Sequence, residues 1–211
     1  MTLISAKTLV WGGGSYLKII RLYLDSVGRE ADFVFSDSGE PTPILEIPDR
    51  YPELNAAAKK CDSYVVCIGN SYGYRRNQLS IFLRETYNLK PLSLIHSTAY
   101  VCPTAQISSP IVVMPRAVIG SYARLGQDCI VNTNAVIEHE CTVGDGVHVM
   151  GSAVLTGRVA VGSFSTIGTN ATVLPDLAVG SNSFVGAGAV VTKNVPDNLI
   201  VTGIPAKALR D

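Results

Sequence analysis

Two of the three histidines in this chain of 211 residues, His139 and His148, lie nine positions apart among small and aliphatic residues. Because an imidazole titrates near neutral pH, a histidine that reaches a substrate can take the proton from an attacking amine or hydroxyl. Acidic residues flank His139 on both sides, at Glu138 and Glu140. A carboxylate on the other ring nitrogen would fix the tautomer and stabilise the imidazolium. His139 is therefore a candidate general base. The alternative is that His139 is a surface histidine that makes one hydrogen bond.

A six-residue repeat must position these residues. Every sixth residue from Ile95 to Val191 is Ile, Leu or Val, without an insertion, and the residue two places earlier is usually small. A valine-rich sandwich would lose this phase within a few strands, because its turns are irregular. The fixed period predicts a solenoid in which each repeat is one short strand and a corner. The aliphatic residue would fill the interior, and the glycine that often follows it would relieve the corner.

The repeat also predicts which side chains face outward. His139 comes two places after the aliphatic Ile137 and should project from the surface. Cys141 is two residues from His139, and a cysteine beside a histidine can act as a nucleophile. However, Cys141 occupies the inward small position of the repeat, as Cys129 does two repeats earlier. A thiol enclosed in a packed coil cannot reach a substrate. We therefore expect that the reaction proceeds without a covalent intermediate on Cys141.

The first ninety residues follow a different pattern, in which short apolar runs alternate with amphipathic segments. We expect strands at residues 7–11, 31–37, 62–70 and 92–95, and helices at residues 15–28, 51–60 and 75–88. Strands that alternate with helices predict a parallel sheet with crossover helices. The fold class is thus an α/β N-terminal domain over residues 1–92, followed by a coil of hexapeptide repeats over residues 93–211.

A glycine-rich turn stands at the end of the first expected strand. Backbone N–H groups at Gly12, Gly13 and Gly14, which open a helix, suit a phosphate. The third glycine of the dinucleotide-binding fingerprint is missing, so tight packing alone is the alternative. Asp37 ends the second strand and Asn70 follows the third. These residues would outline a crevice at the carboxyl ends of parallel strands, where open α/β sheets bind ligands.

Composition narrows the class of partner. The chain has 17 basic and 17 acidic side chains, which argues against nucleic acid or an anionic membrane as the main partner. No apolar run reaches spanning length, and no charged-then-apolar leader opens the chain. The five cysteines are an odd number without metal-ligand spacing. We expect a reduced, cytoplasmic protein without a metal.

The hexads, with "GGGSYLK" at the front, "VIEHEC" in the middle and "VPDNLIVTGIPAK" at the end, resemble the hexapeptide-repeat sugar acetyltransferases over nearly all 211 residues. The resemblance implies a left-handed parallel β-helix with a C-terminal cap, and a homotrimer with sites at the subunit interfaces. It implies transfer from acetyl-CoA to a nucleotide-linked amino sugar for surface glycan biosynthesis. O-acetylation of sialic acid or of a polysaccharide unit is one alternative, and a non-catalytic trimeric scaffold is the other.

By this resemblance His139 is the general base and Glu140 the acid that orients it, with Glu138 as the competitor. Three repeats make one coil of this fold, so residues eighteen apart stack, and Gly157 should lie one coil after His139. The backbone N–H of Gly157 could then contact the thioester carbonyl oxygen. His148 should lie on another face and line the cofactor channel across the trimer interface. Further contacts with acetyl-CoA are expected from Thr169, Ala187 and Lys207.

The acceptor would bind at the N-terminal domain. The nucleotide half is expected to contact Gly12, Gly13, Gly14, Tyr16, Asp37 and Asn70. Tyr16 stands where the family usually has a histidine, so the acceptor geometry should differ or the tyrosine should replace it as a hydrogen-bond donor. The tail "GIPAKALRD" is expected to hold a CoA phosphate through Lys207. A helix that only caps the coil is the alternative.

Overall fold

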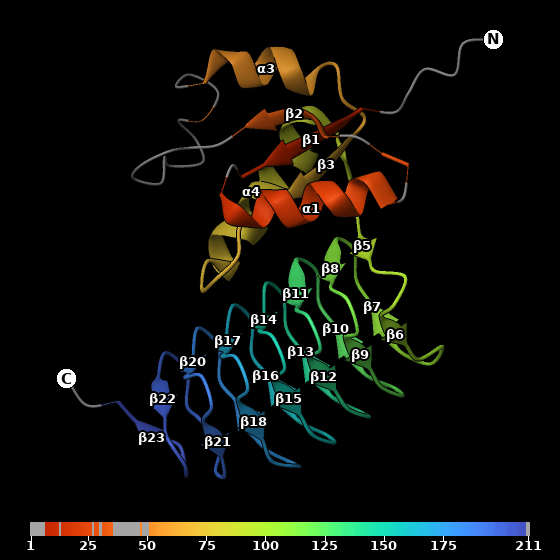
Figure 1. Cartoon of the computed structure of the whole chain (residues 1–211). Helices are drawn as coiled ribbons and strands as arrows, with labels where there is room; N and C mark the ends of the chain where they lie inside the picture. The colour runs from red at the N-terminus through yellow and green to blue at the C-terminus, as the bar shows by residue number, and fades with distance from the viewer. Residues whose placement is uncertain are drawn as a thin grey trace. The chain divides into compact units, whose positions relative to one another are not determined.

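The computed structural model of this protein describes residues 7–12, 14–26, 28–29, 31–35, 47 and 51–209. The chain divides into two compact units (Figure 1). The first comprises Met1–Ile68 with Arg75–Ser93, and the second comprises Gly69–Tyr74 with Leu94–Asp211. The short segment Gly69–Tyr74 therefore groups with the C-terminal coil, although it lies between two elements of the N-terminal unit.

The N-terminal unit contains the predicted parallel sheet. In the described residues its strand order is β2-β1-β3-β4, and all neighbours pair in parallel. The strands are β1 (Thr8–Trp11), β2 (Ala31–Phe35), β3 (Ser63–Val66) and β4 (Lys90–Pro91). The helices are α1 (Ser15–Ser26), α3 (Pro52–Ala58) and α4 (Gly73–Tyr87). The alternation of strands and helices along the chain confirms the α/β class.

The fourth strand is not where the sequence predicted it. The short strand β4 pairs with β3, whereas Leu94–Ile95 (β5) pairs with Ile111–Val113 (β8) of the coil. The N–H groups of Lys90 and Leu92 donate to Asp62 O and Tyr64 O at 3.0 Å, and the chain then passes to the coil, where the N–H of His96 donates to Val113 O. Leu94 and Ile95 therefore belong to the first repeat of the coil, and the expected strand 92–95 in the N-terminal sheet was wrong.

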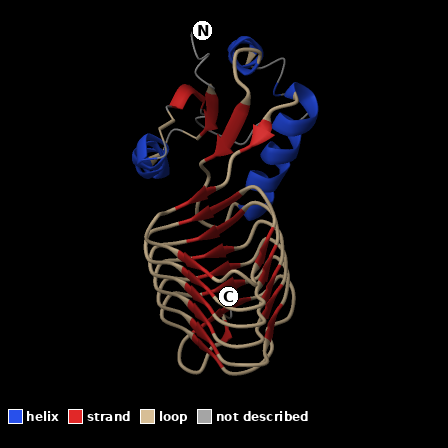
Figure 2. Ribbon diagram, turned by 90° about the vertical axis from the view of Figure 1, so that its right-hand side faces the viewer, coloured by secondary structure: helices blue, strands red, loops and turns tan. Residues whose placement is uncertain are grey.

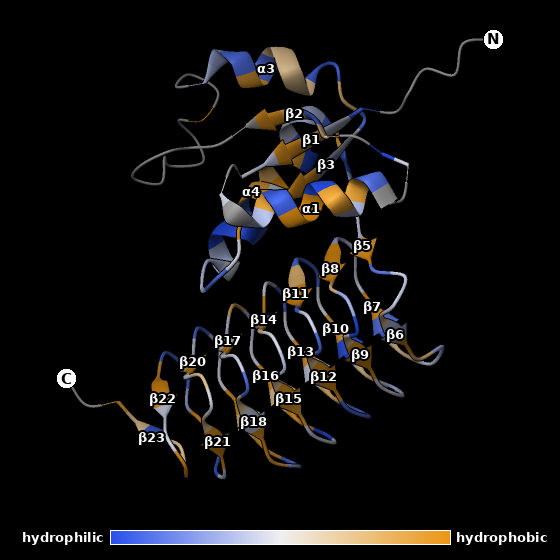
Figure 3. Cartoon of the chain, in the orientation of Figure 1, coloured by the Kyte–Doolittle hydropathy of each residue, from blue (hydrophilic) through white to orange (hydrophobic). Residues whose placement is uncertain are grey.

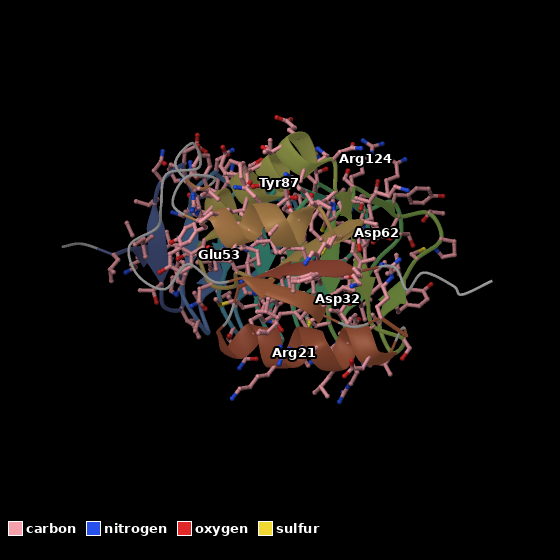
Figure 4. All side chains as sticks on the ribbon, turned by 90° about the horizontal axis from the view of Figure 1, so that it is seen from above. Arg21, Asp32, Glu53, Asp62, Tyr87 and Arg124 are labelled. Carbon is pink, nitrogen blue, oxygen red and sulfur yellow. The ribbon has the colours of Figure 1, made fainter. Side chains whose placement is uncertain are left out.

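Apolar side chains of the strands and helices form the core of this unit. Leu9 and Trp11 on β1, Tyr64 on β3 and Leu83 on α4 have no exposed surface. Coloured by hydropathy, the strands of the sheet are mostly apolar (Figure 3). Charged side chains such as Arg21 on α1 lie on the outside (Figure 4). No helix in the described part of the chain is long and apolar enough to cross a membrane.

The C-terminal unit is a parallel β-solenoid of the left-handed β-helix type, as predicted, and Figure 2 shows its stacked coils. Three sheets run along it within residues 94–209. The first sheet contains β7 (Gln106–Ile107), β10 (Arg124–Leu125), β13 (Thr142–Val143), β16 (Ala160–Val161) and β19 (Ala178–Val179). The second contains β5, β8, β11 (Cys129–Val131), β14 (His148–Val149), β17 (Thr166–Ile167), β20 (Phe184–Val185), β22 (Ile200–Thr202) and β23 (Lys207–Ala208). The third contains β6 (Tyr100–Val101), β9 (Val118–Ile119), β12 (Val136–Ile137), β15 (Val154–Leu155), β18 (Thr172–Val173) and β21 (Val190–Val191).

The register of the coil is eighteen residues. Val136 pairs with Val154 and His148 pairs with Thr166, so each coil repeats the one before it. The fourteen repeat aliphatics from Val113 to Val191 are at most 3% exposed, which confirms that they fill the interior. The first repeat position, Ile95, is 43% exposed because no coil precedes it in the solenoid.

The corners differ from the prediction. A residue with positive φ recurs every six positions at the third place after the aliphatic, as at Glu140 with a φ of 59°. The glycines that directly follow the aliphatics, such as Gly120, do not have positive φ. A Cβ at Gly120 would lie 2.9 Å from the backbone N of His139 in the next coil. These glycines are therefore required by the close approach of consecutive coils, and their predicted role in relieving the corner was wrong.

Candidate active site

His139 lies at the corner that follows strand β12. Its side chain is 47% exposed, which confirms the outward direction that the repeat predicted. The backbone around it is held from both neighbouring coils. The N–H of Glu140 donates to Ser121 O at 2.8 Å, and His139 O accepts from the N–H of Arg158 at 2.9 Å. The imidazole is therefore presented to solvent by a backbone fixed on both sides.

Glu140, and not Glu138, bonds the imidazole. Oε2 of Glu140 is 3.1 Å from Nδ1 of His139. The left-handed backbone of Glu140 turns the chain at this corner and brings its carboxylate beside the preceding side chain. With Nδ1–H donated to the carboxylate, Nε2 carries the lone pair that can accept a proton.

Gly157 lies over the imidazole, one coil after His139. A Cβ built at Gly157 would collide with Nε2 of His139 and lie 2.6 Å from Cε1. Any other residue at this position would therefore displace the ring. Gly157 itself is buried, and no acceptor in the described part of the chain takes its backbone N–H. A free N–H beside the imidazole is the type of group that could stabilise a developing oxyanion.

An ion pair beside this corner was missed by the sequence analysis. Arg158 donates from Nε to Asp176 Oδ1 at 2.6 Å and from Nη2 to Asp176 Oδ2 at 2.9 Å. The Arg158 guanidinium holds the pKa of the Asp176 carboxyl below its usual value, and Asp176 in turn raises the pKa of Arg158. Their separation of eighteen residues, one coil, was the signal in the sequence that could have identified the pair.

His148 is buried, 3% exposed, on strand β14 of a different sheet from β12. Its Nδ1 is 3.1 Å from Asn70 O, and its Nε2 is 3.2 Å from Nδ2 of Asn132. Oδ1 of Asn132 accepts from the N–H of Thr133 at 2.7 Å, so its NH₂ group must face the histidine. His148 is therefore a neutral imidazole that donates from Nδ1 and accepts at Nε2. The structure confirms that His148 and His139 lie on different faces.

The other residues expected to contact acetyl-CoA are exposed but do not lie at the His139 corner. Thr169 follows β17 and Ala187 follows β20, and Thr169 O accepts from the N–H of Gly188 at 2.8 Å. Lys207 lies on β23, which pairs antiparallel with β22. The tail therefore forms a strand, and the alternative of a capping helix was wrong. The left-handed φ of 93° at Gly203 turns the chain back on β22.

The expected crevice is only partly described. Gly13 of the glycine turn after β1 lies outside the described residues, as does Asp37 after β2. A Cβ at Gly12 would lie 2.6 Å from Cys67 O, and the φ of Gly12 is 122°, so only glycine fits there. Gly14 is exposed, and its carbonyl accepts from the N–H of Leu17 at 3.0 Å in the first turn of α1. Tight packing therefore accounts for Gly12, whereas Gly14 is open to a ligand.

Tyr16 lies in the first turn of α1, near the buried cation of Arg76. Burial raises the pKa of the Tyr16 phenol, and the Arg76 guanidinium lowers it in part, so the hydroxyl keeps its proton and can donate. Arg76 is 2% exposed and donates from Nη1 to Ile68 O at 2.8 Å. Sequence reasoning did not single out Arg76, because its helix shows no pattern that marks a buried arginine. Asn70 contributes its carbonyl to His148.

Cys141 occupies the inward position that the repeat predicted. It has no exposed surface, and its Sγ lies 3.1 Å from Thr156 O. Burial raises the pKa of this thiol, so the nucleophilic thiolate is disfavoured. Cys129 has the same environment, with Sγ 3.1 Å from Gly144 O. The structure therefore supports the expectation that neither thiol attacks a substrate. No cluster of possible metal ligands occurs among the described residues.

Known structures of sugar acetyltransferases are similar to this chain over nearly its whole length. A histidine mutant of perosamine N-acetyltransferase from Caulobacter crescentus, in complex with CoA and GDP-perosamine, has a TM-score of 0.84 and 25% sequence identity, covering 99% of this chain and 98% of that chain. The acetyltransferase domain of PglB from Neisseria gonorrhoeae has a TM-score of 0.82 and 30% identity, covering 96% and 99%. Its complex with acetyl coenzyme A has a TM-score of 0.83 and 29% identity, covering 97% and 100%. No family model and no curated protein matches the chain.

A coil of six-residue repeats with a histidine and its carboxylate at an outer corner, together with these likenesses, defines an acyltransferase. The chain belongs to the hexapeptide-repeat sugar acetyltransferase family.

Proposed function

We propose that this protein transfers the acetyl group of acetyl-CoA to the amino group of a nucleotide-linked amino sugar, for surface glycan biosynthesis. Similar structures contain CoA with GDP-perosamine, or acetyl coenzyme A. The observation that carries the proposal is the His139 corner. There Glu140 holds Nδ1, and Gly157 has no side chain that would cover Nε2 of the half-exposed imidazole.

In the proposed reaction, Nε2 of His139 accepts a proton from the neutral sugar amine as its nitrogen attacks the thioester carbonyl carbon. The C–N bond forms and the C–S bond breaks. The imidazolium, which Glu140 stabilises, then returns the proton to the leaving thiolate of CoA. The N–H of Gly157 is placed to stabilise the oxyanion of the intermediate. A positioned base contributes about 10²–10⁴-fold and one oxyanion donor about 10²–10³-fold.

The proposal places the acceptor nucleotide at the N-terminal domain, residues 1–92. The buried Arg76 near Tyr16 and the exposed Gly14 before α1 support an anionic ligand there, because a cation and the start of a helix suit phosphate. The odd number of cysteines supports a cytoplasmic setting.

We also propose a homotrimer with shared sites. Within one chain, His139 lies at a corner after the third sheet, whereas Thr169 and Ala187 lie at a corner after the second. A neighbouring subunit would bring the second corner to the first. Residues of the two corners could then bind one acetyl-CoA between them.

A thiol-release assay with acetyl-CoA tests the proposed reaction. The acceptors are a panel of nucleotide-linked amino sugars, the matched nucleotide sugars with hydroxyl in place of the amine, and free sialic acids. We expect release only with amino acceptors, and loss of release in His139→Asn. Preference for hydroxyl acceptors would favour O-acetylation. No release with any acceptor, from a folded protein that binds acetyl-CoA, would favour the scaffold alternative.

A further inference from the structure

Three charged residues stack at the corner of His139. Glu140, Arg158 and Asp176 follow one another at intervals of one coil, with φ values of 59°, 61° and 63°. Consecutive coils are separated by about 4.8 Å, the spacing of neighbouring strands. The column therefore places a cation between two carboxylates. Each carboxylate is within reach of the Arg158 side chain, since a guanidinium ends a long and flexible stem.

The structure pairs these charges in only one way. Arg158 uses Nε and Nη2 in a two-point contact with Asp176, while Glu140 bonds Nδ1 of His139. Within residues 94–209, all of them described, Arg158 forms an ion pair with Asp176 and none with Glu140. Glu140 also contributes to the raised pKa of Arg158, and His139 to the lowered pKa of Asp176, so all four groups lie within Coulomb range.

We propose that Asp176 is a positioning residue that holds Arg158 away from Glu140 and so leaves Glu140 to orient His139. The inference rests on the proposed function, in which His139 is the base. Without the Asp176 carboxylate, Glu140 is the remaining carboxylate of this column for the guanidinium fork. A Glu140–Arg158 pair would compete for the carboxylate that holds Nδ1–H. It would also leave a cation near a ring that must become positive.

Other charged or titratable groups around the imidazole are unchanged by this exchange. Glu138 precedes His139 directly, Tyr122 lies at the same corner one coil earlier with a φ of 58°, and Arg124 begins β10 just after it. These groups contribute a constant background. The variants proposed next change only the charges of Arg158 and Asp176.

The test uses the full-length enzyme as Asp176→Asn, Arg158→Gln and the double variant. We expect Asp176→Asn to lower kcat by about three- to tenfold, a coupling typical of groups in contact. Arg158→Gln should stay within about twofold of the wild type, and the double variant should recover to that level. The double variant recovers because, without the Arg158 guanidinium, Asp176 is no longer needed to keep a cation away from Glu140. The KM for acetyl-CoA should not change in any of the three.

The pH dependence gives a readout that a structural role would not move. Without the Asp176 anion, the Arg158 cation disfavours imidazolium, also when it pairs with Glu140, so Asp176→Asn should shift the acid limb of kcat/KM to lower pH. Arg158→Gln leaves the Asp176 anion alone and should shift the limb to higher pH. Each shift should be about 0.2–0.5 pH unit at low ionic strength and smaller in salt. NMR of protein labelled with ¹³C at histidine Cε1 should show the same shifts for His139, with His139→Asn to assign the signal.

Equal losses in Asp176→Asn and the double variant would overturn the proposal, as would wild-type kinetics and titration in Asp176→Asn. Melting temperatures and solution mass confirm that each variant is folded. His139→Asn separates the two levels of inference. If that variant keeps its turnover, the proposed function itself fails. If it loses turnover while Asp176→Asn behaves as the wild type, only the role of Asp176 fails.

Discussion

At the scale of single residues, the candidate site depends on the different environments of the two ring nitrogens of His139. Nδ1 of His139 lies 3.1 Å from Glu140, and Nε2 faces a glycine where any Cβ would collide with it. The carboxylate fixes which nitrogen carries the proton, and the glycine keeps the other nitrogen accessible. The side chain contributes little to packing because it is about half exposed. Its replacement should therefore affect chemistry far more than stability.

His139→Asn should lower turnover by about 10²-fold or more, the loss expected for a positioned general base. Melting temperature and acetyl-CoA affinity, measured by calorimetry, should be preserved. His96→Asn is the matched control, because His96 is a half-buried histidine at the start of the coil, away from the His139 corner, and its Nδ1 bonds Thr98 of its own turn. It should stay within about twofold of the wild type. A His139 variant that retains a tenth or more of wild-type turnover would contradict the assignment.

Gly157→Ala should displace the imidazole, because the added Cβ would meet Nε2 and lie 2.6 Å from Cε1. We expect turnover to fall at least about tenfold, since misplacement of about 1 Å costs up to about 10²-fold. Gly151→Ala is the control, because a Cβ there meets only Thr133 O at 3.5 Å, an ordinary contact. Thiol release measures both variants. Equal activity in Gly157→Ala and Gly151→Ala would mean that catalysis does not need the His139 imidazole in the position next to Gly157.

At the scale of elements, the hexad gave strong information about which side chains face inward and little about the corners. A period of six specifies spacing, so the inward places of Ile137 and Cys141 followed from counting alone. The left-handed backbone three places after the aliphatics from Val113 to Val185 left a weaker mark, because Glu, Arg, Ser, Tyr and Phe occupy it as well as Asn, Asp and Gly. The Arg158–Asp176 pair was missed for a related reason. The two residues become neighbours only after the coil is closed.

The N-terminal unit was predictable to the level of element order. Its strands and helices alternate clearly in hydropathy, whereas the two-residue strand β4 contains a proline and has no apolar pattern. The apolar run at 92–95 was therefore assigned to the sheet, although it begins the solenoid. Buried Arg76 could not be identified either, because a cation in a helix normally indicates a solvent-facing side.

The inward position of the coil makes a specific prediction for Cys141→Ser. Ser165 occupies the same inward position four repeats later, and its Oγ donates to Gly180 O, fifteen residues on. The Cys141 thiol contacts Thr156 O with the same spacing. A serine hydroxyl at 141 should therefore find an acceptor, and the variant should melt within a few degrees of the wild type with full turnover. Cys141→Val should instead be destabilised by overpacking, by about 1–3 kcal/mol. Loss of turnover in folded Cys141→Ser would reopen a covalent route.

At the scale of the whole molecule, one chain separates the residues assigned to one reaction. His139 follows the third sheet, Ala187 follows the second, and His148 is enclosed by Asn70 and Asn132. In a trimer with rotational symmetry, each interface joins different surfaces of two subunits, so the His139 corner of one subunit can lie against the Ala187 corner of the next. The proposed trimer is therefore a statement about catalysis as well as assembly, and it can be tested through activity.

Mixed trimers of His139→Asn and Ala187→Trp subunits should regain activity that each variant lacks alone. Ala187 is exposed, so tryptophan there should block the acetyl-CoA surface without entering the core. In a random equal mixture, about one quarter of the interfaces combine an intact His139 with an intact Ala187 surface, so about a quarter of wild-type activity is expected. Two affinity tags purified in sequence would verify the mixing, and light scattering would measure the mass. Verified mixed trimers without activity would place the whole site in one chain. A monomer with full activity would exclude the shared site altogether.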